Sequence, residues 1–305
     1  MAKTGSLKLG GQVVDLTNTD RVMFPDVGVT KRDVIDYYKD VADLMIHEIA
    51  DRALTMERYT KSIAEGGFVM KHAQKHYPEW IPRAELGEKT VVEYPVCNSQ
   101  AALVYFANQG GVAFHIWASQ IETPNHPNEI VFDLDPPDIS AFPLVRQTAH
   151  VLKDLLEELN LPTYVKTSGS KGLHVVVPTD AKATYEKVRE LVSLIAKLLI
   201  ERYPDLVTLE FHKKDRKGRL YFDTGRNIMG ATFVAPYSLR GRPGAPISAP
   251  LAWPEIDEPD FQPNGIRLRD WNARRDAVGD AWYGWRKKPG SVAKAIKKLQ
   301  SIVAG

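Results

Sequence analysis

Apolar residues recur along the chain with two different periods, which together predict a mixed α/β fold. Spacings of three and four residues predict amphipathic helices over 30–49, 99–108, 142–159 and 185–203. Residues 13–25 are predicted to form a short strand that runs into a polar turn. Short apolar runs bounded by turn residues predict further strands over 53–59, 68–72, 90–95, 112–117, 163–167, 173–178, 207–211 and 220–223. Thr30, followed three residues later by Asp33, matches the capping pattern that opens a helix.

One predicted strand ends in two acidic residues. The stretch Ile130–Pro137 reads IVFDLDPP, and alternation along a strand places Asp133 and Asp135 on the same face. The two prolines cannot extend a ladder of backbone hydrogen bonds, so the acidic end lies at an open rim. Paired carboxylates suit hard cations such as Mg2+ or Mn2+, whereas a solvated strand end is the simpler alternative.

The order of elements around this strand favours the metal site. From 130 to 223 the order is strand, helix, strand, strand, helix, strand, which matches the ferredoxin-like, or RRM-like, unit. In that unit the helices cover one sheet face, the other face is free, and the first and last strands are neighbours. We therefore expect Asp223 to stand beside Asp133 and Asp135, and three carboxylates can hold two divalent ions.

A loop rich in glycine and serine joins the two middle strands of the unit. It reads Ser168-Gly169-Ser170-Lys171-Gly172, and such a loop offers backbone N–H groups, hydroxyls and one cation to a phosphate. The order differs from a Walker loop, and a strand rather than a helix follows. An ordinary tight turn is the alternative, and proximity to the acidic strand favours the phosphate cradle.

Two cations occupy the first turn of the helix that begins at Thr30. Lys31 and Arg32 stand at the positive end of the helix dipole, where acids are favoured, so we expect either an anion between them or two solvated charges. His115 lies in an apolar strand, where a histidine is more often a hydrogen-bonded core residue than a ligand. The tryptophans at 271, 282 and 285 are expected to pack in the core.

Composition limits the partners. The 305 residues carry a net charge of only +2, so a nucleic-acid surface must come from local clusters of basic residues. Such clusters occur at Lys213, Lys214, Arg216, Lys217, Arg219, Arg226, Arg240 and Arg242. The single cysteine, Cys97, excludes an internal disulfide and a cysteine-rich zinc site. The absence of a signal-type segment and of a membrane-length apolar run predicts a cytoplasmic protein without membrane association.

Four segments, in this order, resemble the polymerase domain of bacterial ligase D, a branch of the archaeo-eukaryotic primase superfamily. They are IVFDLDPP, TSGSKGLHVVVP, RLYFD and APYSLRGR, and the earlier LTNTDRVMFP and VTKRDVIDYY extend the resemblance. The resemblance implies two interlocked modules, an N-terminal α/β module and an RRM-like catalytic module. We expect residues 1–121 to bind DNA ends, 122–245 to carry catalysis, and 246–305 to form a basic, tryptophan-containing extension packed on the core.

The resemblance also implies roles for individual residues. Asp133, Asp135 and Asp223 fall on the catalytic metal triad. The positions that contact the incoming nucleotide match His115, Ser168, Ser170, Lys171, Arg216, Arg240 and Phe68, and those that grip a recessed 5′-phosphate match Asn18, Arg21 and Lys31. The chain departs from the family pattern at three places. Val69 follows Phe68 where a second aromatic is expected, Glu57 replaces a lysine, and Arg21 replaces a lysine.

These implications predict a template-directed nucleotidyltransferase that uses two Mn2+ or Mg2+ ions and NTP or dNTP substrates, with a preference for ribonucleotides. It would fill gaps or extend 5′-phosphorylated break ends in non-homologous end joining, with a Ku-like end-binding protein and a DNA ligase as partners, in the cytoplasm at the nucleoid. The chain contains no Asp-Gly dipeptide and so lacks the nucleophile motif of the ligase module. A dedicated primase and a non-catalytic RRM-like binding module are the alternatives, although aspartates stand where such a module has aromatics.

Overall fold

The computed structural model describes residues 3–87 and 90–304 and divides them into two compact units. The first unit comprises Met1–Trp117, Val234–Ala249 and Ile266–Gly279, and the second comprises Ala118–Phe233, Pro250–Gly265 and Asp280–Gly305. Mixed α/β structure in both units confirms the predicted fold class. The three-part division by function stays a prediction. No helix in the described part of the chain is long and apolar enough to cross a lipid bilayer.

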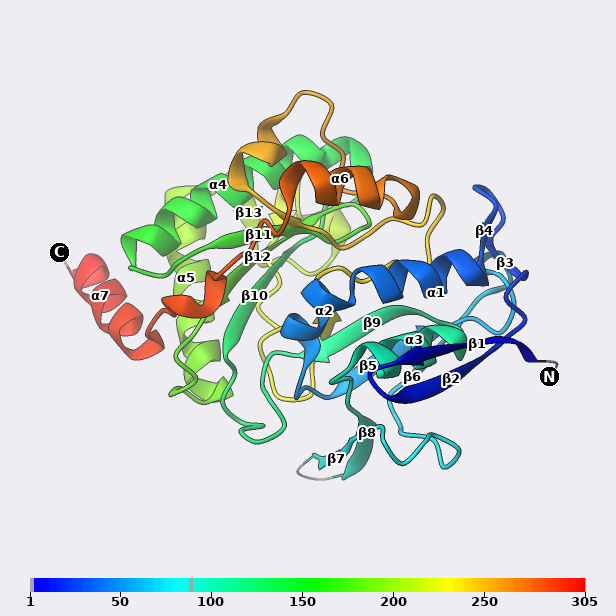
Figure 1. The fold of residues 1–305 in the computed structure, drawn as a ribbon. Helices are drawn as coiled ribbons and strands as arrows, with labels where there is room; N and C mark the ends of the chain where they lie inside the picture. Colours follow the sequence, from blue (N-terminus) through cyan, green and yellow to red (C-terminus); the bar gives the residue numbers. More distant parts are fainter. Residues whose placement is uncertain (1–2, 88–89, 305) are drawn as a thin grey trace. The chain divides into compact units, whose positions relative to one another are not determined.

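The first unit is built on a sheet with the strand order β15-β9-β5-β6 (Figure 1). Its elements are β1 (Lys3–Leu9), β2 (Gln12–Thr17), β3 (Val22–Phe24), β4 (Val29–Thr30), α1 (Lys31–Asp40), α2 (Ala42–Ile49), β5 (Leu54–Arg58), β6 (Phe68–Met70), β7 (Arg83–Leu86), β8 (Val92–Pro95), α3 (Gln100–Asn108), β9 (Gly111–Trp117) and α6 (Trp271–Val278), and β15 (Thr232–Val234) leads into its second segment. The strands β1, β3, β4, β7 and β15 have no counterpart among the predicted strands.

The predicted helix over 30–49 is two helices. Thr30 caps α1 as expected, with its hydroxyl accepting from the Asp33 N–H and the Asp33 carboxylate accepting from the Thr30 N–H. The helix ends at Val41, and α2 begins at the next residue. The apolar stripe nevertheless stays buried across the break, which is why its period runs on through the sequence as if one helix were present.

The second unit contains an antiparallel sheet with the order β10-β12-β11-β16. Its elements are β10 (Glu129–Leu134), α4 (Phe142–Glu158), β11 (Tyr164–Thr167), β12 (Leu173–Pro178), α5 (Tyr185–Arg202), β13 (Val207–Thr208), β14 (Leu220–Tyr221), β16 (Pro250–Leu251) and α7 (Val292–Ala304). Helix α4 packs on β10 and β12, α5 packs beside α4, and α7 packs on α5 (Figure 1).

Two features of the predicted ferredoxin-like unit are wrong in detail. Strands β10, β12 and β11 pair as that unit requires, but β14 pairs in parallel with β13 in a separate two-stranded sheet rather than beside β10. The second sheet face is not free either, because Trp282 and Trp285 pack against Tyr164 on it. Both tryptophans and Trp271 are buried, which confirms their predicted packing role.

Candidate active site

The acidic strand belongs to a row of ionisable side chains that crosses three strands. In the antiparallel register Asp133 of β10 lies opposite His174 of β12, and His174 lies opposite Lys166 of β11. Cross-strand partners share a sheet face, so all three side chains project from the same face. His174 Nε2 is 3.6 Å from Asp133 Oδ1. His174 and Lys166 are both buried, so this row of ionisable side chains extends into the interior of the protein.

The third predicted carboxylate reaches the same place. Asp223, just after β14, lines a cavity of about 350 Å3 together with Asp133 and Asp135. The guanidinium of Arg226 joins two of them, with its Nε 3.2 Å from Asp133 Oδ2 and 3.2 Å from Asp223 Oδ2. The remaining lining residues include Lys171, Phe211, Arg216 and Tyr221. Three acids and three cations therefore line one cavity, which we call the acidic pocket.

Contacts other than strand pairing hold Asp223 at the acidic pocket. The side-chain amide of Asn227 makes two hydrogen bonds to the backbone of β10, accepting from Val131 N at 3.0 Å and donating to Val131 O at 2.9 Å. Phe222 packs against Phe132 with ring centroids 5.7 Å apart. These contacts hold the segment that follows β14 against the edge of β10, in place of the strand pairing that the sequence predicted.

Burial and like charge make the ionised form of Asp133 costly. Burial raises the pKa of Asp133 to about 6, the neighbouring carboxylates of Asp135 and Asp223 add to the increase, and the cations of Arg226 and Lys166 oppose it. The site therefore favours any positive charge that comes between these carboxylates. In this structure the guanidinium of Arg226 supplies that charge.

This donor set fits a hard divalent ion in its chemistry. Three carboxylates supply oxygen ligands, and their mutual repulsion is relieved by a cation. Within residues 3–87 and 90–304 no group of three His, Cys, Asp or Glu side chains is already arranged as a metal-ligand set. Arg226 bridges two of the three carboxylates, so an ion would take over the contacts that the guanidinium now makes.

The Ser168–Gly172 loop forms the β11–β12 hairpin turn, and its own hydroxyl holds it closed. Ser168 Oγ accepts from the N–H groups of Ser170 and Gly172, each at 3.2 Å, so these two N–H groups do not face an anion as predicted. Lys171 does line the acidic pocket, and its Nζ donates to the carbonyls of Pro136 and Pro137, each at 3.2 Å. The loop thus supplies a fixed cation rather than a full backbone cradle.

Gly172 explains why the loop lies so close to the acidic strand. A Cβ atom at this position would be 2.0 Å from the Leu134 carbonyl oxygen and 3.1 Å from Asp135 Oδ1. Any side chain there would push the loop off the strand end that carries Asp135. The final glycine of SGSKG is therefore required for packing.

Arg216 is the member of the basic cluster at 213–219 that lines the acidic pocket. Its guanidinium donates to the backbone carbonyls of Glu210 and Phe211 at 3.2 and 2.7 Å, and it stacks over the Tyr221 ring with its Cζ 4.7 Å from the centroid. These contacts hold the cation of Arg216 beside the pocket. Phe211, which also lines it, is largely exposed.

The other predicted nucleotide contacts, His115, Arg240 and Phe68, belong to the first unit. His115 Nε2 is 3.2 Å from Glu57 Oε1 on the neighbouring strand β5. The hydrogen bond from His115 lowers the pKa of Glu57 to about 2, and the positive charge of Arg240 contributes to the shift. Phe68 is exposed on β6, opposite Arg58 of β5. His115 and Arg240 therefore both act on the carboxylate of Glu57.

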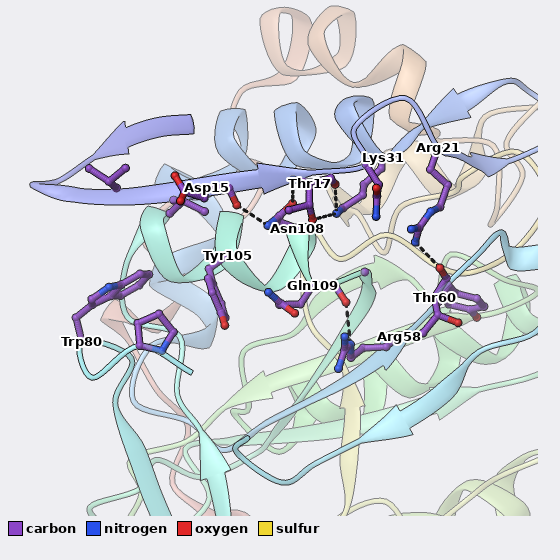
Figure 2. Close-up of a pocket in the computed structure, with 16 residues that line it drawn as sticks. Asp15, Thr17, Arg21, Lys31, Arg58, Thr60, Trp80, Tyr105, Asn108 and Gln109 are labelled. Carbon is purple, nitrogen blue, oxygen red and sulfur yellow. Dashed lines mark hydrogen bonds between the residues drawn. The ribbon is translucent and has the colours of Figure 1, made fainter. Parts of the chain in front are cut away.

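The three residues predicted to grip a 5′-phosphate line one cavity of the first unit (Figure 2). This cavity, which we call the end pocket, has a volume of about 400 Å3, and Arg21 and Lys31 lie at one end of it. Arg58, which the sequence analysis did not single out, adds a third cation. Arg21 donates to Thr60 O, Lys31 Nζ donates to Thr17 O, and Arg58 Nε donates to Gln109 O at 2.8 Å.

The first turn of α1 differs from the prediction in one respect. Lys31 N donates to Arg21 O at 2.7 Å, Arg32 N donates to Thr19 O at 2.9 Å, and Asp33 N donates to the Thr30 hydroxyl at 3.2 Å. The backbone N–H groups of this turn are therefore committed inside the protein and do not face an anion. Arg32 pairs with Asp36 at 2.6 Å, whereas the Lys31 side chain is buried at the pocket.

Burial and neighbouring cations make Lys31 an unusual lysine. Burial, together with the positive charges of Arg21 and Arg58, lowers the pKa of Lys31 from 10.5 to about 8. Three cations that repel one another in a partly enclosed site favour an anion. The end pocket has this property without needing the helix N-terminus.

Sequence reasoning missed Arg58, Lys166, His174 and the bridging position of Arg226. For Lys166 and His174 a signal existed, because a tight hairpin at 168–172 fixes the register that brings both into line with Asp133. Arg58 stands at the end of an apolar strand, and no local pattern in the sequence marks it.

The fold and these sites can now be compared with known proteins. The family model described as the primase-polymerase domain of LigD matches residues 30–282. The chain belongs to this family.

The multifunctional non-homologous end joining protein LigD of Mycolicibacterium smegmatis is 34% identical over 270 residues, which is 88% of this chain and 35% of that protein. The bifunctional LigD of Bacillus subtilis is 33% identical over 244 residues, which is 80% of this chain and 39% of that protein. The solved polymerase domain of Mycobacterium tuberculosis ligase D in complex with DNA superposes with a TM-score of 0.82 at 30% identity, covering 91% of this chain and 99% of that one. The chain therefore spans little more than a third of these curated relatives and nearly all of the solved polymerase domain.

Proposed function

We propose that the protein is a template-directed nucleotidyltransferase that extends or fills DNA ends during non-homologous end joining. The observation that carries this proposal is the acidic pocket, in which Asp133, Asp135 and Asp223 lie together with the cations of Lys171, Arg216 and Arg226. Membership of the LigD primase-polymerase family supports it. A pocket with opposed acids and bases is suited to a metal-bound triphosphate and poorly suited to nucleic acid alone.

In this mechanism the three aspartates hold two divalent ions, Mn2+ or Mg2+. Bound there, the ions would supply activation of a primer 3′-hydroxyl and charge stabilisation of the departing pyrophosphate. The chain's own cations neutralise the triphosphate of the incoming NTP or dNTP: Lys171 is fixed by two proline carbonyls, and Arg216 is fixed by its stacking on Tyr221. Arg226 keeps Asp133 and Asp223 together until the ions bind.

The remaining contacts to the nucleotide are proposed from the family resemblance. His115, Arg240, Ser168, Ser170 and Phe68 are the proposed contacts. Ser168 and His115 are the candidates for a hydrogen bond to the ribose 2′-hydroxyl, which would give a preference for ribonucleotides. Val69, beside Phe68, cannot stack as an aromatic does, so the base is held by one ring. Competition between ribo- and deoxynucleotides in one extension reaction tests this preference, and equal incorporation would refute it.

The end pocket is the proposed grip on the 5′-phosphate at the far side of a short gap. Arg21, Lys31 and Arg58 supply charge, and Asn18 supplies an amide. Each charge-assisted contact contributes about 1.5 to 3 kcal/mol, so losing Lys31 should weaken binding of a phosphorylated end by roughly tenfold or more. A Ku-like end-binding protein and a DNA ligase are the partners that this substrate implies, in the cytoplasm at the nucleoid.

Extension of a gapped, 5′-phosphorylated duplex with each metal and each nucleotide type tests the proposal directly. Alanine variants of Asp133, Asp135 and Asp223 should lose extension and keep DNA binding. Retained extension in Asp223→Ala would overturn the assignment of the acidic pocket. Incubation of single-stranded template without primer distinguishes a dedicated primase, because only a primase would then make dinucleotides.

A further inference from the structure

The end pocket has two ends of different chemistry (Figure 2). At one end are the cations of Arg21, Lys31 and Arg58. At the other are the aromatic side chains of Trp80 and Tyr105. The side chains of Asn108 and Gln109 lie between the two ends, as Figure 2 shows.

The end pocket is partly open to solvent and has a volume of about 400 Å3, within the range of small-molecule sites. A cavity of this size matches a small organic ligand, and the joining of an anionic end to an apolar end matches the phosphate and base of a nucleotide.

Two aromatic rings, those of Trp80 and Tyr105, lie at the second end of the pocket. Trp80 lies in the loop between β6 and β7, and Tyr105 lies on α3, and their rings meet edge to face with centroids 5.9 Å apart. Both side chains are only partly buried, so part of each ring is accessible from the pocket. Aromatic faces beside a cationic groove are the usual means by which proteins bind unpaired bases without reading their sequence.

We propose that the end pocket binds the whole terminal nucleotide of the 5′-phosphorylated strand, with the phosphate at Lys31, Arg21 and Arg58 and the base stacked at Trp80 and Tyr105. The base is then unpaired from the template. This inference rests on the proposed 5′-phosphate site and adds to it a nucleobase subsite. Because stacking does not depend on base identity, the subsite accepts any terminal base.

The test measures the Kd of the full chain for gapped duplexes at fixed salt, since phosphate contacts are salt-dependent. Three ends are compared: a 5′-phosphate on an ordinary nucleotide, a 5′-phosphate on an abasic sugar, and a 5′-hydroxyl on an ordinary nucleotide. Trp80→Ala should bind the ordinary phosphorylated end at least fivefold more weakly than the wild type, and the abasic end less than twofold more weakly. Trp80→Phe keeps a ring and should recover most of the loss.

Two controls separate the subsite from the phosphate grip. Lys31→Ala should lose the same factor on the ordinary and the abasic phosphorylated ends. Tyr283→Ala removes an exposed aromatic ring of the second unit and should change no Kd. Thermal melting of every variant identifies losses that come from unfolding.

A mismatch at the terminal base pair provides a second measurement, because it removes the cost of unpairing. The mismatch should strengthen binding by the wild-type chain several-fold and leave Trp80→Ala unchanged. If Trp80→Ala loses nothing, or loses equally on ordinary and abasic ends, the nucleobase subsite is refuted while the phosphate grip stands. If the wild type binds phosphate and hydroxyl ends equally, the phosphate grip itself is refuted.

Discussion

His115 Nε2 lies 3.2 Å from Glu57 Oε1 across the β5–β9 pair. The family resemblance predicts a lysine at position 57, whereas this chain has a glutamate there and pairs its strand histidine with that acid. The pairing holds the imidazole in one orientation, and the carboxylate also lies in the field of Arg240. The chain therefore balances charge within this cluster of the first unit.

The low pKa of Glu57 makes a prediction for stability. Its folded-state pKa is about 2, below the ordinary 4.5, so its contribution is complete above pH 4.5 and is lost as the pH falls through 2. Glu57→Gln should cost roughly 1 to 2 kcal/mol at pH 7, because the partly exposed pair is screened by solvent. In urea denaturation, the difference in unfolding free energy between the wild type and Glu57→Gln should be constant from pH 8 to 5 and should decrease below about pH 4. A difference that increases on acidification would contradict this account.

The effect of ionisation on stability should have the opposite sign at Asp133. Its folded-state pKa of about 6 exceeds the ordinary 3.8, so ionisation destabilises the fold fully above pH 6 and not at all below pH 3.8. Asp133→Asn should therefore abolish extension and yet stabilise the metal-free protein at pH 7.5 by roughly 1 to 3 kcal/mol. Melting in the presence of a chelator measures this, and the gain should shrink at pH 5. Asp154→Asn on the exposed face of α4 is the control and should change little.

Arg226 should compete with divalent ions for Asp133 and Asp223. Removing its guanidinium leaves the two carboxylates without the cation that now bridges them. In the absence of DNA and nucleotide, Arg226→Ala should bind Mn2+ at least fivefold more tightly than the wild type in a calorimetric titration. Arg219→Ala removes a nearby arginine that donates to backbone carbonyls, and it serves as the matched control. Unchanged Mn2+ affinity in Arg226→Ala would show that the guanidinium does not occupy the ion's place.

Lys31 should make recognition of phosphorylated ends sensitive to pH. Its pKa of about 8 means that the ammonium is present below pH 8 and is lost as the pH rises. A terminal phosphate is already dianionic over this range, because its second pKa is about 6. The affinity advantage of 5′-phosphate over 5′-hydroxyl ends should fall several-fold between pH 7 and 9. Lys31→Ala should show a small advantage that does not change with pH, and a flat profile in the wild type would count against the role of Lys31.

The local elements of this fold follow closely from the sequence, whereas their assembly follows only in part. Period and capping signals predicted α3, α4 and α5 to within a residue or two, because burial of one face determines both the pattern and the helix. The two-residue strands β13 and β14 were harder. Their pairing depends on tertiary contacts such as Phe222 on Phe132, and no local pattern in the sequence records these contacts.

At the acidic pocket, too, local structure could be predicted from the sequence, whereas the tertiary contacts could not. Alternation along β10 placed Asp133 correctly on one face, and the approach of Asp223 was predicted for a reason that proved wrong. Strand pairing was the expected cause, and the structure instead uses a side-chain amide and a bridging arginine. Side-chain contacts of this kind leave no repeating pattern in the sequence. The proximity of Asp223 to Asp133 could therefore be predicted, but the contacts that produce it could not.

Asn227 has a consequence beyond placing Asp223. Strand β10 is the last strand on its side of the sheet, and an open strand edge can recruit a strand from another molecule and so begin aggregation. The amide of Asn227 donates and accepts at Val131 as a neighbouring strand would, and it is itself buried. The Asn227 side chain therefore occupies the two backbone groups that a strand from another molecule would need at Val131, two residues before Asp133. An added strand could pair with this edge only by displacing Asn227.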